Sequence, residues 1–142
     1  MKSPPPAVPS WQHVAGLTGR IQELAQMVRA GLPYKTLARF QEESELTMDS
    51  IALVMQIPRR TMARRKVQGR LTPQESERMV RLLVIYDKAV QLFEGNMPAA
   101  RTWLSTPTKS LSNQTPLRAA ETEFGARAVE DLIGRLEHGV FC

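Results

Sequence analysis

The side chains with the clearest chemical potential are the cations between positions 59 and 70. Six of them occur there without a single acid: Arg59, Arg60, Arg64, Arg65, Lys66 and Arg70. Guanidinium groups bind phosphates, and also the O6 and N7 edge of guanine, through paired hydrogen bonds. The run therefore indicates a nucleic acid as ligand, and the alternative is a solvated basic face that binds nothing.

A helix over residues 58 to 68 would sort these side chains by direction. At about 100° per residue, Met62, Ala63 and Val67 fall on one side, and the other side carries Arg60, Thr61, Arg64 and Arg65. Arg59 and Lys66 fall nearer the apolar side and, at the helix ends, would reach backbone phosphates or solvent. The predicted DNA-binding residues are Arg59, Arg60, Thr61, Arg64, Arg65 and Lys66.

The stretch before this helix has the features of the first half of a helix-turn-helix. Thr47 is a suitable N-cap, and Leu46 and Ile51 occupy the two positions of a hydrophobic staple, so a helix is expected from residue 48 to about 56. The turn position, often glycine, is Gln56. A basic helix that follows such a turn is typical of proteins that read the major groove of DNA.

The longest helix is expected to follow, from Pro73 to about Glu94. Thr72, Pro73 and Glu75 form a strong start signal, with an N-cap, a proline at the first helical position and a glutamate at the third. Its leucine, valine and isoleucine residues spread over more than one face, and such a helix must be buried on more than one face. We therefore expect a central core helix, a homodimer interface, or both.

The last twenty residues combine an amphipathic helix with an apolar ending. Val129, Leu132, Ile133 and Leu136 form one stripe, and Gly139 stands where helices commonly stop. Apolar side chains follow this stop, where chains usually carry unordered polar residues. Two interpretations stay open, because Phe141 can dock on a partner or fold back as a cap on its own helix.

The remaining segments complete an all-α fold class. Residues 1–12 contain four prolines and predict a loose arm, with Trp11 packed on the first helix. Thr18 is expected to cap a short helix with the apolar stripe Ile21, Leu24, Ala25 and Val28. Further short helices are expected after Pro33, Asn96 and Thr115, with an interruption at Gly125 before the final helix. No stretch has the alternation of a strand.

Three motifs in the C-terminal third resemble the toxin-binding domain of the Xre/MbcA/ParS antitoxins. They are Trp103-Leu-Ser-Thr-Pro107, Thr115-Pro-Leu117 and the run from Val129 to Phe141. With the helix-turn-helix, the resemblance covers roughly residues 14 to 142. It implies a helix-turn-helix DNA-binding bundle followed by a small helical toxin-binding domain, and we divide the chain into an arm (1–12), a DNA-binding and dimerisation region (13–94) and a toxin-binding domain (95–142).

The resemblance also implies the partners. In that family the C-terminal region binds and blocks a RES-domain toxin, an enzyme that consumes NAD, and the helix-turn-helix binds operator DNA and represses the shared operon. The apolar ending and its neighbours then become the predicted toxin-binding residues, Arg135, Leu136, Glu137, His138, Gly139, Val140, Phe141 and Cys142. Two alternatives remain: a stand-alone transcriptional regulator whose C-terminal region dimerises or senses a ligand, and a protein-binding adaptor.

Composition argues against several other classes of protein. Two histidines, one cysteine and no glycine-rich phosphate loop leave little material for an active site, so we expect no catalysis, no metal, no cofactor and no small-molecule substrate. The longest apolar run, Leu82–Tyr86, is far shorter than the roughly 20 residues of a membrane span. With no secretory signal and a single cysteine, a cytoplasmic location is expected.

Overall fold

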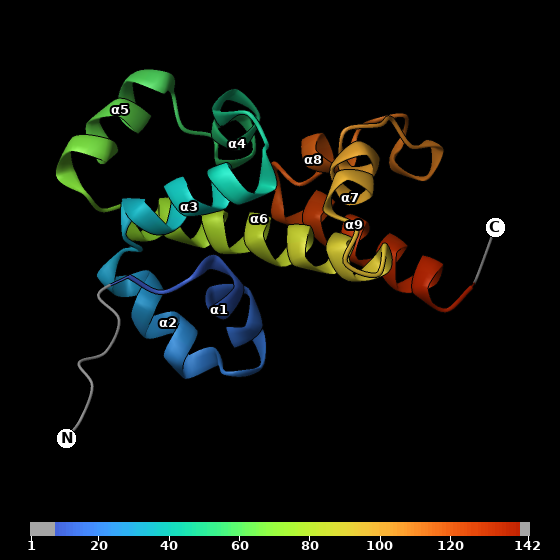
Figure 1. Cartoon of the computed structure of the whole chain (residues 1–142), viewed down its shortest axis with the longest axis horizontal. Coiled ribbons are helices and arrows are strands. Elements are labelled where there is room, and N and C mark those ends of the chain that lie inside the picture. The colour runs from blue at the N-terminus through green and yellow to red at the C-terminus, as the bar shows by residue number, and fades with distance from the viewer. Residues whose placement is uncertain (1–7, 140–142) are drawn as a thin grey trace.

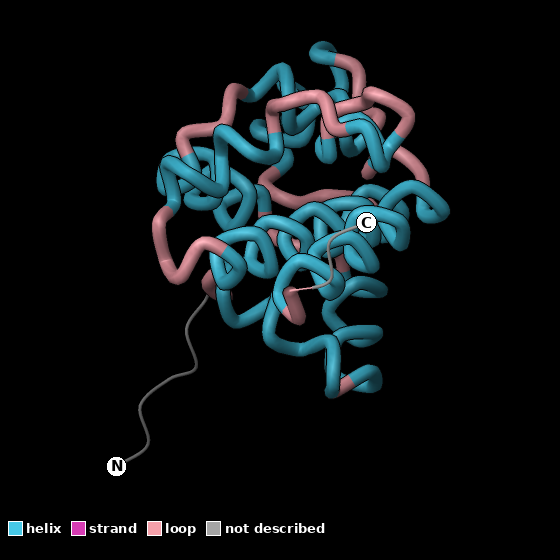
Figure 2. Tube along the Cα trace, turned by 90° about the vertical axis from the view of Figure 1, so that its right-hand side faces the viewer, coloured by secondary structure: helices cyan, strands magenta, loops and turns pink. Residues whose placement is uncertain are grey.

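The structure, a computed structural model, describes residues 8–139. In that range it contains helices and loops and no strand, which confirms the all-α class (Figure 2). The elements are α1 (Trp11–Gly16), η1 (Leu17–Gly19), α2 (Ile21–Ala30), α3 (Tyr34–Ser44), α4 (Met48–Met55), α5 (Arg59–Gln68), α6 (Pro73–Leu92), α7 (Met97–Leu104), η2 (Lys109–Leu111), α8 (Pro116–Ala119) and α9 (Glu123–Glu137).

Helix α6 runs through the middle of the molecule, and most other helices pack on it (Figure 1). The helix begins as expected, because the Thr72 side chain accepts a hydrogen bond from the Glu75 amide and the Glu75 carboxylate accepts one from the Thr72 amide. Helices α1 and α2 cover one side of α6, α4 another, and α7 and α9 its C-terminal half. Both halves of the fold are therefore built on one continuous helix.

This packing changes the argument for a homodimer. After Pro73, every apolar side chain of α6 is buried or half-buried within the single chain, and Leu82, Leu83 and Tyr86 are inaccessible to solvent. The apolar surface that suggested a second copy is thus covered by the chain's own helices. The expectation of a core helix is confirmed, whereas the surface of α6 gives no reason for dimerisation.

The N-terminal end of the folded part is fixed by aromatic packing. Trp11 is the first residue of α1, so the arm predicted for residues 1–12 ends sooner, and residues 1–7 lie outside the described range. The Trp11 ring packs edge-on against Phe40 of α3 and Tyr86 of α6, with ring centroids 5.3 and 5.4 Å apart. Trp11 therefore joins three helices instead of packing on the first predicted one.

The predicted cap of α2 is wrong. Thr18 lies in η1, where its hydroxyl donates to the Ala15 carbonyl oxygen at 3.1 Å, and α2 starts at Ile21. Ile21, which the helical stripe placed inside, is 65% exposed. The hydroxyl of Thr18 closes the end of α1, and that bond competes with capping the next helix.

The C-terminal half follows the predicted order of helices, with one difference at Gly125. This glycine lies within the first turn of α9 and does not interrupt the chain before it. A β-carbon at Gly125 would stand 1.8 Å from the carbonyl oxygen of Ala119, the last residue of α8. The absence of a side chain therefore lets the start of α9 approach the end of α8.

We expect Gly125→Ala to destabilise the protein by about 1 to 3 kcal/mol, the usual cost of forcing extra volume into a filled site. Gly134 offers a matched control on the same helix, because nothing lies within 4 Å of its β-carbon position. Gly134→Ala should stabilise the protein by about 0.5 to 1 kcal/mol, since alanine loses less conformational freedom in a helix. Urea unfolding measures both changes, and equal effects of the two substitutions would contradict the close approach.

Candidate functional site

Helices α4 and α5 form the expected helix-turn-helix. The Thr47 side chain accepts from the Ser50 amide, and Leu46 and Ile51 are both buried, as a hydrophobic staple requires. Gln56 ends α4 in the left-handed region at φ +54°, and Ile57 is buried in the turn. The three-residue connection presents α5 at the surface of the molecule (Figure 1).

Helix α5 is attached to the body along one narrow side. Met62 is its only buried residue, and Thr61 and Arg65 are half-buried on the same side. Ala63 and Val67, which were predicted to face inward, are exposed, Val67 to 88%. The helix is rotated relative to the prediction because a polar contact, rather than an apolar stripe, holds it.

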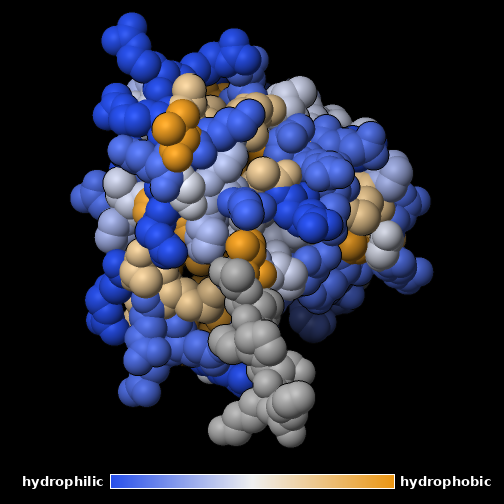
Figure 3. All heavy atoms as spheres, turned by 60° about the vertical axis from the view of Figure 1, so that its left-hand side comes forward, coloured by the Kyte–Doolittle hydropathy of each residue, from blue (hydrophilic) through white to orange (hydrophobic). Residues whose placement is uncertain are grey.

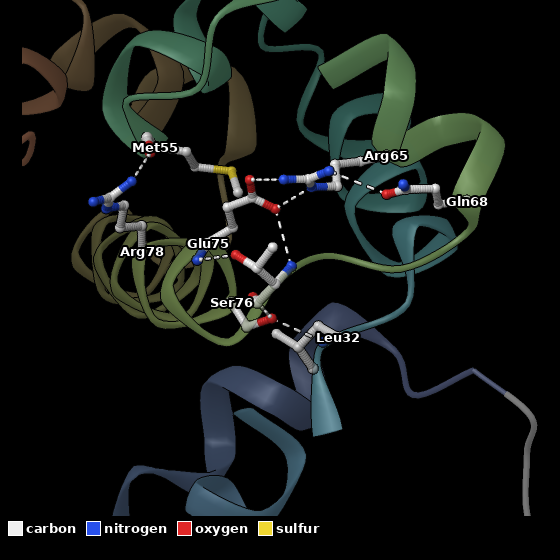
Figure 4. Close-up of polar contacts among 8 residues, drawn as sticks. Leu32, Met55, Arg65, Gln68, Glu75, Ser76 and Arg78 are labelled. Carbon is white, nitrogen blue, oxygen red and sulfur yellow. Dashed lines mark hydrogen bonds and ion pairs between the residues drawn. The ribbon is translucent and has the colours of Figure 1, made fainter. Parts of the chain in front are cut away.

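That contact is an ion pair between Arg65 and Glu75. The guanidinium donates to both carboxylate oxygens, from Nε at 2.7 Å and from Nη2 at 3.0 Å, and a further Arg65 nitrogen donates to Gln68 Oε1 at 3.1 Å (Figure 4). The two side chains of the pair are only 14% and 9% exposed. The structure thus directs Arg65 toward α6, away from the solvent side on which the sequence placed it.

The Arg65–Glu75 pair determines the charge of both groups. Burial alone would raise the pKa of the Glu75 carboxyl, but hydrogen bonds from Arg65 and from the Thr72 amide outweigh burial, so that this pKa is lowered from its ordinary value of 4.5. The hydrogen bond with Glu75 raises the pKa of Arg65. Glu75 therefore stays ionised, and it fixes α5 and caps α6 with the same carboxylate.

Replacing Glu75 by glutamine tests this arrangement, because glutamine can still cap α6 but carries no charge. We expect a loss of about 3 kcal/mol in unfolding free energy at neutral pH, as when one partner of a buried ion pair is removed. Since the folded-state pKa of Glu75 is lowered, its stabilisation is present above pH 4.5 and is lost as the pH falls through the folded value. The difference between wild type and Glu75→Gln should therefore shrink in acid.

The exposed pair between Arg59 and Asp49 provides the control for that measurement. Its atoms are 3.0 Å apart, but the side chains are 83% and 67% exposed. Asp49→Asn should cost no more than about 1 kcal/mol. Thermal unfolding followed from pH 3 to 8 distinguishes the variants, and a loss for Glu75→Gln that is as small as that for Asp49→Asn would show that the Arg65 contact contributes little.

The other predicted DNA-binding cations remain accessible. Arg59, Arg60, Arg64 and Lys66 are exposed on α5 and Thr61 is half-buried. Within residues 8–139, none of the ion pairs involves Arg60, Arg64 or Lys66. Figure 3 brings the side that carries α5 forward and shows a mainly hydrophilic surface with small apolar spots. This side of α5 can donate hydrogen bonds to a negatively charged ligand.

The end of the basic run has a structural role. Arg70 follows the cap residue Gly69, and its guanidinium donates to the carbonyl oxygens of Ala30 and Gly31 at the end of α2. The Tyr34 amide donates to the Gly69 carbonyl oxygen at 2.9 Å. The C-terminal end of α5 is thereby tied to the connection between α2 and α3.

The second candidate region is the end of α9. Val129, Leu132 and Ile133 are buried and Leu136 is half-buried, as the helical stripe predicts. The helix ends at Glu137, and Gly139 has the left-handed φ of +70° expected of a helix stop. Three predicted toxin-binding residues, Arg135, Glu137 and His138, are exposed, as is Gly139, whereas Val140, Phe141 and Cys142 lie outside the described residues.

Comparison with known proteins agrees with both regions. A family model described as the antitoxin Xre-like helix-turn-helix domain matches residues 23–84, and one described as the antitoxin Xre/MbcA/ParS C-terminal toxin-binding domain matches residues 88–139. A protein named Antitoxin Xre from Yersinia enterocolitica is 39% identical over 132 residues, covering 92% of this chain and 89% of its own. The chain belongs to the Xre/MbcA/ParS antitoxin family.

A second Antitoxin Xre, from Photorhabdus laumondii, is 33% identical over 133 residues, which cover 93% of this chain and 90% of the relative. The chain is therefore an antitoxin with a helix-turn-helix domain and a toxin-binding domain, and it is not an enzyme. The two family models meet inside α6. None of the helices in the described range is long and apolar enough to cross a membrane.

The two halves of the antitoxin also meet at the helix-turn-helix turn. Gln56 donates from Nε2 to the Glu121 carbonyl oxygen at 2.6 Å, and Arg81 of α6 donates to the same oxygen at 3.1 Å. Glu121 lies between α8 and α9, within the toxin-binding domain. Sequence reasoning noted only that Gln56 replaces a common glycine, and the spacing of these residues gave no signal of their contact.

Proposed function

We propose that this antitoxin neutralises a RES-domain toxin that consumes NAD and represses its own operon, as in a type II toxin–antitoxin pair. The observation that carries the proposal is that one helix, α6, joins an outward basic helix to a toxin-binding domain. The RES partner rests on the resemblance of the C-terminal motifs. The same chain would then control both the activity and the synthesis of its toxin.

For operator binding we propose contacts from Arg59, Arg60, Arg64 and Lys66, which are exposed on α5, and from Thr61, which is half-buried at the edge of its attached side. Arginines suit both phosphates and guanine edges, whereas lysine suits phosphates. Arg65 is not among the proposed contacts, because its guanidinium is hydrogen-bonded to the Glu75 carboxylate. We assign to Arg65 the role of holding α5 in position for its neighbours.

For toxin binding we propose Arg135, Leu136, Glu137, His138 and the ending Gly139–Cys142. Arg135, Leu136 and Glu137 lie in the last turn of α9 and His138 follows it, and Arg135, Glu137 and His138 are exposed. Arginine at such a place can pair with acidic or phosphate-binding groups of an NAD-consuming enzyme. The proposed division of the chain places these residues in the domain of residues 95–142.

We further propose that the antitoxin acts on DNA as a homodimer. Two recognition helices related by a two-fold axis would contact half-sites about one helical turn apart, and the operator would carry an inverted repeat. Light scattering at tens of micromolar tests this directly. A monomer bound to DNA without an inverted repeat would exclude it.

Co-expression with the product of the adjacent gene tests the proposal as a whole. The toxin alone should stop growth and lower cellular NAD, and the antitoxin should restore both and co-purify with the toxin. Growth arrest without loss of NAD would exclude a RES-domain toxin as the partner, but it would not exclude the antitoxin function. A chain that binds DNA but neither rescues growth nor co-purifies would instead be a stand-alone regulator.

A further inference from the structure

The outermost line of side chains on α5 contains both guanidinium and apolar groups. Arg60, Ala63, Arg64 and Val67 follow the spacing i, i+3, i+4, i+7, so they share one face of the helix. All four are exposed, and they lie opposite the attached side formed by Met62 and Arg65. We call these four residues the α5 ridge.

Val67 is the unusual member of the α5 ridge. A single exposed apolar residue is common on protein surfaces and needs no explanation by itself. Val67, however, is 88% exposed on a ridge whose other members are two arginines and a small alanine, and it lies one turn from Arg64. A partner that fits this ridge must therefore present an anionic surface with an apolar feature close to hydrogen-bond acceptors.

The major groove of B-DNA offers that combination. Guanine presents the acceptors N7 and O6, and the methyl group of thymine is the apolar feature of the groove. From Arg60 to Val67 the helix rises about 10 Å, at about 1.5 Å per residue, which matches about three base-pair steps of about 3.4 Å. The absence of acids between positions 59 and 70 agrees with DNA as the occupant.

We infer that Val67 is a specificity-determining residue, which contacts a thymine methyl group beside guanines bound by Arg60 and Arg64, with Ala63 leaving room for the bases. Helix α5 then lies lengthwise in the groove, since the ridge is exposed from one end to the other. This inference rests on the proposed DNA binding. It adds the class of base sequence that the helix selects.

Uracil substitution tests the contact, because uracil is thymine without the methyl group. A duplex selected by the wild-type antitoxin from a random library serves as the probe, and affinity is measured by fluorescence anisotropy at fixed salt. At one thymine, replacement by uracil should weaken wild-type binding about threefold to fourfold, which is the contribution expected from the burial of one methyl group. Val67→Ala should bind the thymine duplex equally weakly and lose nothing further on the uracil duplex.

Ile21→Ala is the matched control, because Ile21 is 65% exposed on α2, away from the basic helix. This variant should keep wild-type affinity and full sensitivity to uracil, and circular dichroism should show unchanged helix content for both variants. Three results would overturn the inference while DNA binding stands: a selected site without thymine, full uracil sensitivity in Val67→Ala, or dissociation of a dimer by that substitution. If wild type selects no duplex, the proposed DNA binding fails as well.

Discussion

Operator binding is expected to collapse when Arg60 and Arg64 are both replaced by alanine. Each side chain is exposed on the α5 ridge, and each lost base contact should cost about 1 to 3 kcal/mol. If either contacts a phosphate instead, the dependence of affinity on salt should become less steep. Titration of the operator at several salt concentrations measures both effects.

Arg127→Ala/Arg135→Ala is the charge-matched control for that double variant. Both arginines are exposed on α9, so their removal lowers the net charge equally without touching the helix-turn-helix. The control should keep the wild-type affinity for DNA. Binding by Arg60→Ala/Arg64→Ala that stays unchanged at near-physiological salt would place the DNA interface elsewhere.

Arg65 is left out of the double variant because of its buried ion pair with Glu75. Arg65→Ala would leave the Glu75 carboxylate buried without its partner, and α5 would lose an attachment together with any DNA contact. A failure of Arg65→Ala to bind DNA would therefore not distinguish between the two roles. Arg60 and Arg64 form no ion pair among the described residues, so their removal is expected to leave the fold intact.

Removal of the residues after His138 is expected to abolish neutralisation of the toxin. Helix α9 ends at Glu137 and Gly139 is exposed, so helix content and DNA binding should persist in the shortened antitoxin. An aromatic anchor such as Phe141, whose placement lies outside the described residues, contributes about 2 kcal/mol or more when it enters a desolvated pocket. Growth rescue and co-purification measure the loss.

The melting temperature separates docking from the alternative in which Phe141 folds back on its own helix. In that case the truncated antitoxin should first lose thermal stability, and inhibition would fall only as a consequence. Under docking the melting temperature stays that of the full chain. A truncated antitoxin that still neutralises the toxin at an equimolar dose would place the inhibitory surface within residues 96–137.

Most of the fold could be predicted because its local signals agree with one another. Thr47 and Thr72 begin helices as expected, and the stripe of Val129, Leu132 and Ile133 is buried. Such signals act over four residues or fewer, and tertiary packing did not oppose them. Gly125 shows the limit of such local signals. The sequence shows only that a glycine is present, and it does not show that α8 approaches α9 closely at this residue.

The side of α5 that faces the body could not be predicted either, because a contact with another helix determines it. An apolar stripe orients a helix when apolar burial holds it, but α5 is held by Met62 and by the pair between Arg65 and Glu75. The partner lies ten positions further along the chain, across a turn whose geometry the spacing does not reveal. The capping pattern identified Glu75, yet it gave no sign that the same carboxylate also binds α5.

The sharing of α6 by the two halves has a consequence for the lifetime of the antitoxin in the cell. The family models meet inside this helix, where residues 85–87 are buried or half-buried, and Gln56 is hydrogen-bonded to the Glu121 carbonyl oxygen, so the two halves share packing and polar contacts. We therefore expect a protease that unfolds one half to unfold the other with it. Under the proposed functions, one proteolytic event frees the toxin and relieves repression of its promoter at the same moment, so that release and resynthesis start together.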